Sequence, residues 1–547
     1  MHIRFHPANP RPNYISPSGA KGCCHHAYPQ PLSLPPAKKT GHVGIADKAL
    51  AHFPIGTFAH FQILLMAYEA NTFQNLIGHA KEYGYIFQSS EIYDGLSAVY
   101  DYGQNGAQLK KNIRDAWWKT MTQLNDNIVG IDAAIFMHPT TWKASGHVDS
   151  FSDPMIDNKD SNKRYRVDHL IEAHAEKLKA EGETQKADAL IAQMDQLLAA
   201  DDLAGVKQLI IDNNMKCSVS GTCNWTDVRQ FNLMFSTELG SVTDEASTIY
   251  LRPETAQGIF VNFLNVQKTG RMKIPFGIAQ TGKAFRNEIV ARQFIFRMRE
   301  FEQMEMQFFI RPGSQKEWYE HWKTERLKWH KDIMGFPTDR LQYHDHVKLA
   351  HYADAAVDIE FEFPFGFKEL EGIHSRTDYD LGRHQEFSKK KQQYFDTEIN
   401  QNYVPYVIET SVGLDRLVLA TLANAYAEEK WTKEDGSEDS RVVLKIPANL
   451  APTKLAVLPL TKKDGLPDLA RELMNECRPA FNCFYEEKDT IGKRYRRMDA
   501  VGTPFCVTID HQTKEDGTVT IRYRDTMTQE RIHMNEVKAK VLAAITK

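Results

Sequence analysis

Hydrophobic residues recur at helical or alternating spacing along most of the chain after Met66. Apolar positions three and four apart predict a helix near 71–84 and a second helix at the end of 85–120. Residues 167–215 have the pattern of a helical hairpin. Dense strand-like patterning begins at 248 and continues to about 310. The first half of the chain therefore predicts mixed helices and strands rather than one repeated unit.

The second half continues this mixture as far as a charged, glycine-containing stretch at 428–441, which is typical of a linker. The elements expected before this stretch are a helix over 314–335, strands near 342–376, a helix around 383–398 and a strand-to-helix unit at 403–426. Beyond it, Lys454–Leu460 reads as a buried strand that opens a separate unit of alternating strands and helices.

The first 65 residues differ in composition from the rest. They hold nine of the 23 prolines and seven of the 21 histidines, but Asp47 is their single acidic residue. Few periodic apolar residues are present to offset chain entropy, so a disordered extension is expected. A targeting peptide is one alternative, although the prolines oppose an amphipathic helix. A mis-assigned start, with the true start at Met66, is the favoured reading.

Overall composition narrows the class of protein. The 547 residues suggest three or four domains, and 25% charged with 42% hydrophobic residues is ordinary for a globular chain. The net charge of −4 is too small to argue for nucleic-acid binding without local basic patches. Seven cysteines form no regular framework, which favours a reducing, cytoplasmic compartment. The chain contains no apolar run long enough for a membrane helix, so no membrane association is expected.

The most informative stretch is 284–308, which reads as a β-hairpin. Arg286 and Glu288 share one face of the first strand, because side chains alternate along a strand. The odd positions of the second strand share one face and are Arg297, Arg299, Phe301, Gln303, Glu305 and Gln307. A salt-bridge ladder on a surface strand would also produce this pattern. Arginines, acids and an aromatic ring together nevertheless match the demands of a nucleotide.

The order Phe-Arg-x-Glu, loop, Arg-x-x-x-Phe resembles motif 2 of the class II aminoacyl-tRNA synthetases. The resemblance implies that Arg286 holds the ATP α-phosphate, Arg297 reaches the γ-phosphate and Phe301 stacks on adenine. Glu288 would meet the adenine amino group, beside Asn287. Fixed guanidinium groups suit this chemistry because carboxylate attack on the α-phosphorus builds negative charge. Arg286 and Arg416 are accordingly the expected catalytic residues.

Two further stretches resemble motifs of the same family. Residues 408–416 are similar to motif 3, where Gly413 allows close approach of the backbone and Arg416 opens an apolar helix as a phosphate ligand. Residues 101–118 resemble motif 1, although Gln104 replaces the usual proline. Because motif 1 mainly builds the dimer interface, the resemblance implies a homodimer.

Longer strings resemble the dimeric class IIa glycyl-tRNA synthetases, over residues 71 to about 545. They are Ser90–Tyr93, Ala144–His147, Leu251–Gly258, Phe301–Glu305 and Glu369–Ile373. The glycine-binding residues implied are Arg166, Glu254, Phe301, Glu302, Gln303, Glu305, Glu409 and Ser411. Acids can receive the ammonium group and Arg166 the carboxylate. Selection of glycine must exclude larger side chains, a role that Ser411 and Glu254 fit.

Metal and RNA ligands follow less directly. Glu369, next to Leu370 in the expected ATP site, lies where the family places a carboxylate that binds Mg²⁺ beside ATP. Cys217 and Cys223 have no evident second pair, so no structural zinc is expected. Arg494, Arg496 and Arg497 interleave with an aromatic residue in the C-terminal unit and are the expected tRNA-binding residues.

These observations predict an α+β fold: an antiparallel-sheet class II synthetase catalytic domain with a helical insertion, and a C-terminal α/β anticodon-binding domain. The expected boundaries are 1–65, 66–441 with the insertion at about 167–215, and 442–547. The expected reaction uses ATP and Mg²⁺ to attach glycine to tRNA(Gly) through a glycyl-adenylate. Two alternatives stay open: an inactive nucleic-acid-binding accessory protein derived from a synthetase, and another class IIa specificity. The accessory protein is disfavoured because the ATP arginines are retained.

Overall fold

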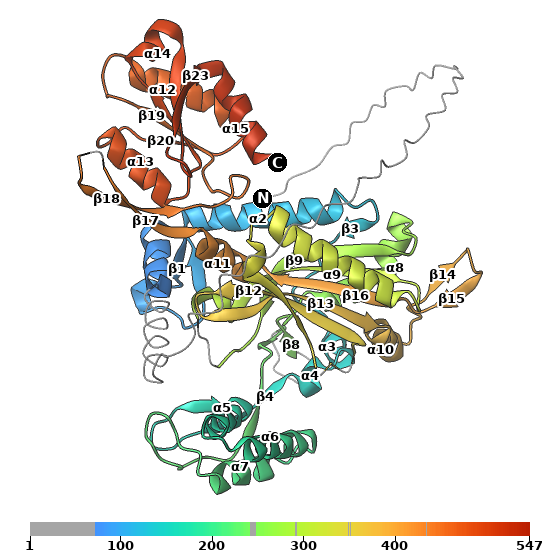
Figure 1. Cartoon of the computed structure of the whole chain (residues 1–547). Coiled ribbons are helices and arrows are strands. Elements are labelled where there is room, and N and C mark those ends of the chain that lie inside the picture. Colours follow the sequence, from blue (N-terminus) through green and yellow to red (C-terminus); the bar gives the residue numbers. More distant parts are fainter. Residues whose placement is uncertain are drawn as a thin grey trace, which may run out of the picture. The chain divides into compact units, whose positions relative to one another are not determined.

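The computed structural model describes residues 72–240, 248–289, 293–347, 349–350, 352–433 and 435–546 (Figure 1). The expected extension or mis-assigned start at 1–65 lies outside the described residues. The first described element is a helix over 72–82, close to the helix predicted at 71–84. Among the described helices, none has both the length and the apolar character that a bilayer crossing requires.

A seven-stranded sheet organises the catalytic domain, in the order β11-β12-β13-β16-β10-β9-β3. Its strands are β3 (Ile128–Gly130), β9 (Phe276–Phe285), β10 (Glu300–Ile310), β11 (Leu341–Asp345), β12 (Ala355–Phe363), β13 (Gly366–Thr377) and β16 (Tyr406–Gly413). Neighbouring strands are antiparallel except for β3, which runs parallel to β9 at one edge. The expected antiparallel sheet is therefore confirmed, with one parallel edge strand.

Alternation along β10 separates the core from the site. Even positions such as Met304, Met306 and Phe308 are buried in the main core. The helices that share this core are α2 (Gln104–Thr122), α9 (Gln315–Asp332) and α11 (Leu414–Ala425) (Figure 1). On the opposite face, α8 (Ala256–Gly270) and α10 (Tyr379–Ser388) pack around Phe309 and Val407. The odd positions nearer the start of β10 are left to line the candidate site.

The inserted segment combines a small sheet with three helices. The sheet order is β5-β4-β6, and its strands are β4 (Ser152–Asp157), β5 (Arg164–Arg166) and β6 (Arg229–Asn232). The helices are α5 (Val167–Ala180), α6 (Thr184–Ala199) and α7 (Leu203–Asp212), whose buried apolar residues form a core of their own. The predicted hairpin is therefore wrong by one helix: Asp202 accepts a hydrogen bond from the Gly205 backbone at 2.8 Å and starts a third helix after a short turn.

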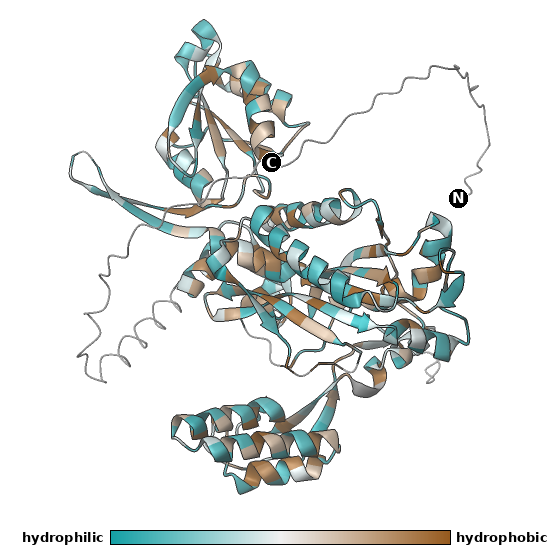
Figure 2. Ribbon diagram, turned by 45° about the vertical axis from the view of Figure 1, so that its right-hand side comes forward, coloured by the Kyte–Doolittle hydropathy of each residue, from teal (hydrophilic) through white to brown (hydrophobic). Residues whose placement is uncertain are grey.

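The C-terminal domain is an α/β unit, as expected. Its sheet order is β20-β19-β21-β22-β23, from β19 (Leu455–Pro459), β20 (Cys483–Tyr485), β21 (Phe505–Ile509), β22 (Thr518–Tyr523) and β23 (Gln529–His533). Its helices are α12 (Leu466–Cys477), α13 (Ile491–Ala500), α14 (His511–Asp516) and α15 (Val537–Ile545). Helices α12 and α15 share one apolar core with the sheet, while α13 packs on a smaller one; Figure 2 shows the brown apolar strands between teal-bearing helices.

Two further secondary-structure predictions, for 248–310 and 428–441, are wrong. The strand-like stretch 248–310 contains helix α8, because its buried Ile259, Phe260 and Phe263 crowd one face of a helix and resemble a buried strand in sequence. The supposed linker at 428–441 lies in an antiparallel hairpin, β17 (Tyr426–Thr432) and β18 (Glu438–Leu444). Its charges pair across the strands rather than with water, as between Arg441 and Glu429.

Short elements complete the described chain. They are β1 (Ile86–Gln88), η1 (Glu91–Tyr93), β2 (Tyr100–Tyr102), α3 (Pro139–Ala144), α4 (His147–Ser150), β7 (Ser236–Glu238), β8 (Thr248–Tyr250), η3 (Phe294–Phe296), η4 (Thr338–Arg340), β14 (Tyr394–Asp396), β15 (Gln401–Tyr403) and η5 (Met534–Glu536). The helix expected around 383–398 is wrong in its second half: α10 ends at Ser388, and strand β14 occupies Tyr394–Asp396.

Candidate active site

A cavity of about 490 Å³ opens on the face of the large sheet that carries the odd positions of β10. It gathers residues from β10, β13, β16, α11 and the insertion. Those that the sequence analysis singled out are Arg166, Arg286, Glu288, Arg297, Phe301, Glu302, Gln303, Glu369, Ser411, Gly413 and Arg416. Residues separated by as many as 250 positions in the sequence thus line one cavity.

The Arg286 side chain is held in this cavity by a backbone carbonyl and by two aromatic rings. It directly follows β9, and its Nε donates a hydrogen bond to the Pro253 carbonyl at 3.1 Å. Its guanidinium lies 5.4 Å from the ring centroid of Phe301 and 5.5 Å from that of Phe151. Cation–π contacts on both rings fix the orientation of the charged group.

Arg416 is positioned by the strand-to-helix turn between β16 and α11. Its Nη1 lies 3.0 Å from the Glu369 carboxylate, and its guanidinium packs 4.4 Å from the Phe296 ring centroid. The Arg416 charge lowers the pKa of Glu369, whose side chain is 51% exposed. An ionised, accessible carboxylate is an oxygen ligand of the kind that Mg²⁺ takes beside phosphates, so Glu369 fits its expected role.

Three acids meet farther along the same strands. Gln307 of β10 donates hydrogen bonds to Glu305 at 2.7 Å and to Glu409 of β16 at 2.6 Å. Glu254, which precedes α8, lies 3.4 Å from the His147 ring. Glu305 also accepts a hydrogen bond from the Thr255 hydroxyl. A compact acidic cluster with buried Glu305 and Glu409 results.

Their surroundings separate the pKa values of these acids. Burial opposes ionisation of all three, but His147 and Arg376 outweigh it and lower the pKa of Glu254 to about 2. For Glu409, Arg376 and His374 outweigh burial and hold its pKa well below the ordinary value. Burial and the two neighbouring carboxylates raise the pKa of Glu305 well above the ordinary value. The surroundings therefore favour ionised Glu254 and Glu409 and oppose ionisation of Glu305, and the cluster can accept an ammonium ion.

Sequence reasoning missed the cationic partners of this cluster. Arg376 of β13 donates to Glu409 at 2.8 Å and also pairs with Asp380, and it is buried. His374, two residues earlier, donates to the other Glu409 oxygen at 2.7 Å. Period-two alternation along 372–376 was the available signal, because β13 pairs with β16.

Arg166 lines two cavities. It stands at the end of β5 and pairs with Asp168 at 2.5 Å and Asp153 at 3.2 Å. A second cavity of about 540 Å³ shares Arg166, Phe296 and Arg297 with the first. The basic residues that line it are Lys163, Arg164, Arg166, His169, His174, Lys177, Lys216, Arg297 and Lys368. This basic surface is assembled from distant segments, so no contiguous motif indicated it.

Three predicted site residues are not placed as expected. Glu302 borders the cavity of Arg286, but its carboxylate projects from the core-facing side of β10 and pairs with Arg114 at 2.8 Å and Lys110 at 3.3 Å. The structure thus separates it from Glu305 and Gln303. Leu370 is buried in the main core, and the Asn287 backbone donates to the Leu233 carbonyl at 2.8 Å. Neither of these two lines the cavity of Arg286.

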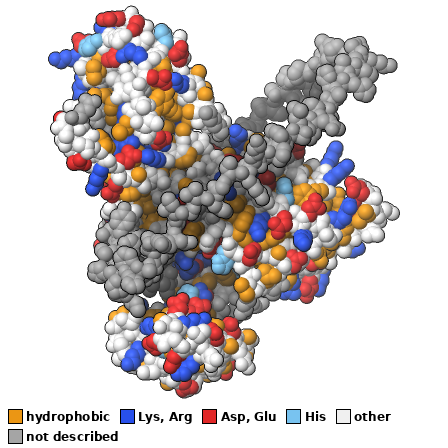
Figure 3. Space-filling view, in the orientation of Figure 1, with side chains coloured by type: hydrophobic (Ala, Val, Ile, Leu, Met, Phe, Trp, Pro, Cys, Tyr) orange, Lys and Arg blue, Asp and Glu red, His pale blue; other side chains and the backbone are white. Residues whose placement is uncertain are grey.

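The prediction that Arg494 binds tRNA is wrong. Its side chain is only 1% exposed, and it donates hydrogen bonds to the carbonyls of Pro459 at 2.8 Å and Glu486 at 3.0 Å. Arg496 and Arg497 are partly exposed but pair with acids, Arg496 with Asp439 at 2.7 Å. Figure 3 shows basic and acidic side chains intermixed on the visible face of this domain. Consecutive arginines on helix α13 point to different faces, which the sequence run conceals.

Three family descriptions match successive parts of the chain. The tRNA synthetase class II core domain (G, H, P, S and T) matches residues 235–425, and the anticodon binding domain matches 454–544. The glycyl-tRNA synthetase insertion domain 1 matches 153–189 and 181–233, a wider stretch than the predicted helical insertion. Fold and site together define a class II aminoacyl-tRNA synthetase.

Full-length relatives sharpen this class. Glycine–tRNA ligase of Chlorobaculum tepidum is 54% identical over 462 residues, which cover 84% of this chain and 97% of the relative. Glycine–tRNA ligases of Treponema denticola and Staphylococcus haemolyticus are 50% and 49% identical, over 86% and 85% of this chain and 97% of each relative. The chain belongs to the glycine–tRNA ligase family.

Proposed function

We propose that this enzyme attaches glycine to tRNA(Gly) in two steps. Glycine and ATP form glycyl-adenylate and release pyrophosphate; the glycyl group is then transferred to the tRNA 3′ end and AMP is released. The observation that carries this proposal is the register of β10 and β16. Glu305 lies opposite Ser411, and Gln303 lies opposite Gly413. The acidic cluster and the arginine-lined cavity therefore lie side by side on the same two strands.

In the first step the glycine carboxylate attacks the α-phosphorus and pyrophosphate leaves. Arg286 and Arg416 stabilise the negative charge that develops on the phosphate oxygens, and Phe301 supports the adenine ring. Arg297 reaches the γ-phosphate, and Glu369 would hold Mg²⁺, which neutralises phosphate charge. Catalysis comes from positioning and charge stabilisation, so the enzyme needs no covalent nucleophile.

Glycine is recognised through its ammonium group. Glu254 and Glu409 carry the negative charge before binding. The bound ammonium ion lowers the pKa of Glu305, which then releases its proton to solvent, because a cation among three carboxyl groups favours their ionised forms. Ser411 lines the cavity opposite Glu305 and, with Glu254, limits the space for a side chain. A larger amino acid is excluded by volume rather than by a specific contact.

The basic cavity around Arg166 is suited to the tRNA 3′ end. It shares a wall with the adenylate cavity, and its lysines and arginines match the phosphate backbone of an RNA single strand. Arg496 and Arg497 remain candidates for anticodon-side contacts once they exchange acidic partners for phosphates.

The working form is proposed to be a cytoplasmic homodimer. Ile92 and Tyr93 of η1 are 87% and 80% exposed, next to the motif 1 helix α2, and a self-association surface would cover them. Free thiols at the described cysteines fit a reducing compartment. A Tyr93→Asp variant should shift the molar mass measured by light scattering from dimer toward monomer.

Glycine-dependent exchange of pyrophosphate into ATP tests the proposal directly. Exchange should require glycine and should be weak with alanine or serine at equal concentration. The absence of exchange from a folded preparation that binds tRNA would favour the accessory-protein alternative. Exchange with serine or another class IIa amino acid in preference to glycine would assign a different specificity.

A further inference from the structure

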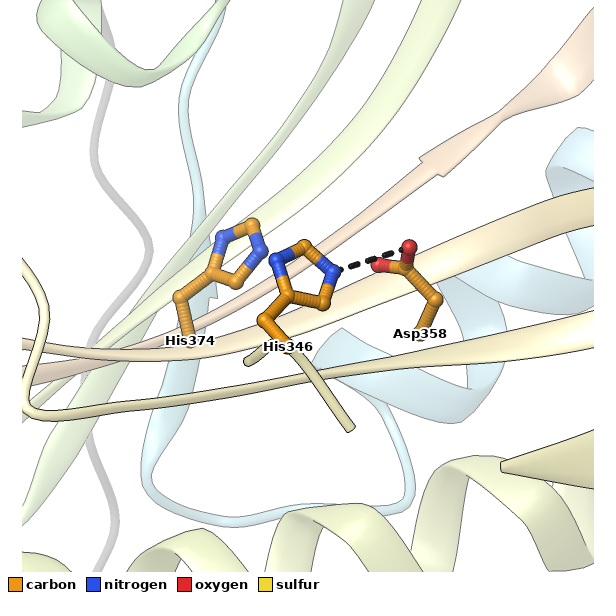
Figure 4. Close-up of side chains that lie close together, drawn as sticks. All are labelled: His346, Asp358 and His374. Carbon is orange, nitrogen blue, oxygen red and sulfur yellow. Dashed lines mark ion pairs between the residues drawn. The ribbon is translucent and has the colours of Figure 1, made fainter. Parts of the chain in front are cut away.

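Two histidines and an aspartate converge near the β11 edge of the large sheet (Figure 4). One potential ligand atom from each of His346, Asp358 and His374 lies within 4.8 Å of the others. His346 Nε2 is 2.9 Å from the Asp358 carboxylate, and the rings of His346 and His374 are 5.9 Å apart between centroids. His346 and Asp358 have no role assigned above, while His374 also contacts Glu409 of the acidic cluster through its other ring nitrogen.

Strand register fixes this convergence. The His346 backbone donates to the Ala356 carbonyl of β12 at 3.1 Å, and Ala356 lies opposite His374 of β13. Asp358 is two residues beyond Ala356 and so shares its face of the sheet. The two histidines therefore flank one position of β12 from either side. Backbone pairing, rather than a chance choice of rotamers, brings the three side chains together.

Gly372 leaves space between two of these groups. A Cβ atom at Gly372 would lie 3.2 Å from His374 Nε2 and 3.5 Å from an Asp358 oxygen. Both atoms therefore border the volume that the missing side chain leaves open. Small side-chain movements would bring them to the 2.0–2.2 Å distances of zinc–nitrogen and zinc–oxygen bonds.

The second nitrogen of His374 is already occupied. Its Nδ1 donates to Glu409 at 2.7 Å, so Nε2 is the nitrogen that faces the cluster and that a metal ion would bind in exchange for a proton. Metal-binding histidines are commonly oriented by this kind of carboxylate contact. Asp358 is only 16% exposed at its side chain and lies near Glu369, so a cation would relieve both its burial and its like-charge neighbour.

We propose that His346, Asp358 and His374 bind a divalent cation of the Zn²⁺ type, with water in the fourth position. Two imidazole nitrogens and one carboxylate suit Zn²⁺ or Co²⁺ and are a poor set for Mg²⁺, which prefers oxygen. The site includes neither Glu369, which lies near Asp358, nor the cysteines Cys217 and Cys223. A plain ion pair between a protonated His346 and Asp358 is the alternative that the experiment must exclude.

Direct metal titration of the full chain tests this site without any substrate, so its outcome is independent of the proposed aminoacylation. Metal-free protein competes with a chromophoric chelator for Zn²⁺. Wild type should bind one ion that His346→Ala and Asp358→Asn each weaken at least about 10-fold. His344→Ala is the matched control, since His344 lies on the same strand, 3.5 Å from Glu360. It should leave the affinity unchanged.

Three results would overturn the proposal. Equal zinc affinity in the wild type and in both cluster variants, each checked for an unchanged melting temperature, would leave only the ion pair. An equal loss of zinc affinity in His344→Ala would show that the ion binds along the exposed β11 edge of the sheet rather than at the three-residue cluster. Co²⁺ supplies the second readout: visible bands without a thiolate charge-transfer band support histidine and carboxylate ligands. A thiolate band that disappears in Cys217→Ser would instead place the ion at the cysteines.

Discussion

Two groups of arginines in this chain differ in how the fold arranges them. Arg286, Arg297 and Arg416 are far apart in sequence and line one cavity. Arg494 and Arg497 are close in sequence and point to different partners, one to backbone carbonyls in the interior and the other to surface acids. Pairing of β10 with β9 and β16 brings the segments that carry the first group together. Arg494 and Arg497 lie three residues apart on α13 and differ in depth of burial rather than in helix face. A run of cations predicts a surface only when the geometry of its element is considered.

The largest effect is expected from the cavity arginines. Arg286→Ala and Arg416→Ala should each reduce the rate of adenylate formation about 100-fold or more, because a preorganised charge is lost at the transition state. Their melting temperatures should stay close to wild type, since neither side chain belongs to an apolar core. Pyrophosphate exchange and thermal unfolding measure the two quantities. Near-normal exchange in either variant would contradict the assigned role.

Arg494→Ala should show the reverse pattern. Loss of a buried guanidinium leaves carbonyls such as Pro459 without a donor and should lower the free energy of unfolding by about 2–3 kcal/mol. Exchange per folded molecule should be unchanged. Chemical denaturation gives the stability, with Arg497→Ala as the partly exposed control. A stable Arg494→Ala protein with weakened tRNA binding would restore the original prediction.

Glu305 gives a pH-dependent effect of intermediate size. Because its pKa is raised in the folded enzyme and glycine binding requires the carboxylate, binding should release a proton. The KM for glycine should fall up to ~10-fold per pH unit below the raised pKa and level off above it. Glu305→Gln should have a higher KM with no such slope. A pH-independent wild-type KM would show that Glu305 is already ionised.

The raised pKa of Glu305 also makes the folding stability depend on pH in a defined direction. Folded Glu305 retains its proton to higher pH than the unfolded chain does, so the wild type loses stability as the pH rises from the ordinary glutamate pKa to the raised value. Glu305→Gln lacks this loss, and its melting temperature should gain on the wild type over that interval. A constant difference across the interval would contradict the raised pKa.

Arg496→Ala should have the smallest effect. The pair with Asp439 is partly exposed and the guanidinium packs 4.6 Å from the Trp431 ring centroid, so the unfolding free energy should fall by about 1 kcal/mol or less. If Arg496 exchanges Asp439 for a phosphate, the salt dependence of tRNA binding should flatten by roughly one unit of slope. An unchanged slope would reduce this residue to surface structure.

The fold and the nucleotide cavity were predictable because their signals are local. Period-two alternation along β10 assigns Met304 and Met306 to the core and Phe301 and Gln303 to the site, and each strand face follows from that parity. The same rule should have placed Glu302 on the core side. The resemblance to a family string implies a glycine-site role for Glu302, whereas its carboxylate pairs with Arg114 and Lys110 on the core side of β10.

Other features depend on long-range pairing that the sequence does not display. Arg376 reaches Glu409 only because β13 lies beside β16, and Arg441 becomes buried only when β18 meets Asp499 of the C-terminal domain. Because the sequence does not reveal the contact with Asp499, the charges of 428–441 resemble those of a solvated linker. Charged residues in sequence indicate solvent or a buried partner equally well, and the partner here is about 60 positions away.

The wall shared by the two cavities has a practical consequence for inhibitor design. Arg166, Phe296 and Arg297 contribute to both the adenylate cavity and the basic cavity. A compound anchored by a nucleotide-like group in one cavity needs only a short tether across Phe296 to reach lysines in the other. A resistance substitution at any of the three wall residues would alter both cavities. It would therefore impair the binding of two substrates and reduce the fitness of the resistant enzyme.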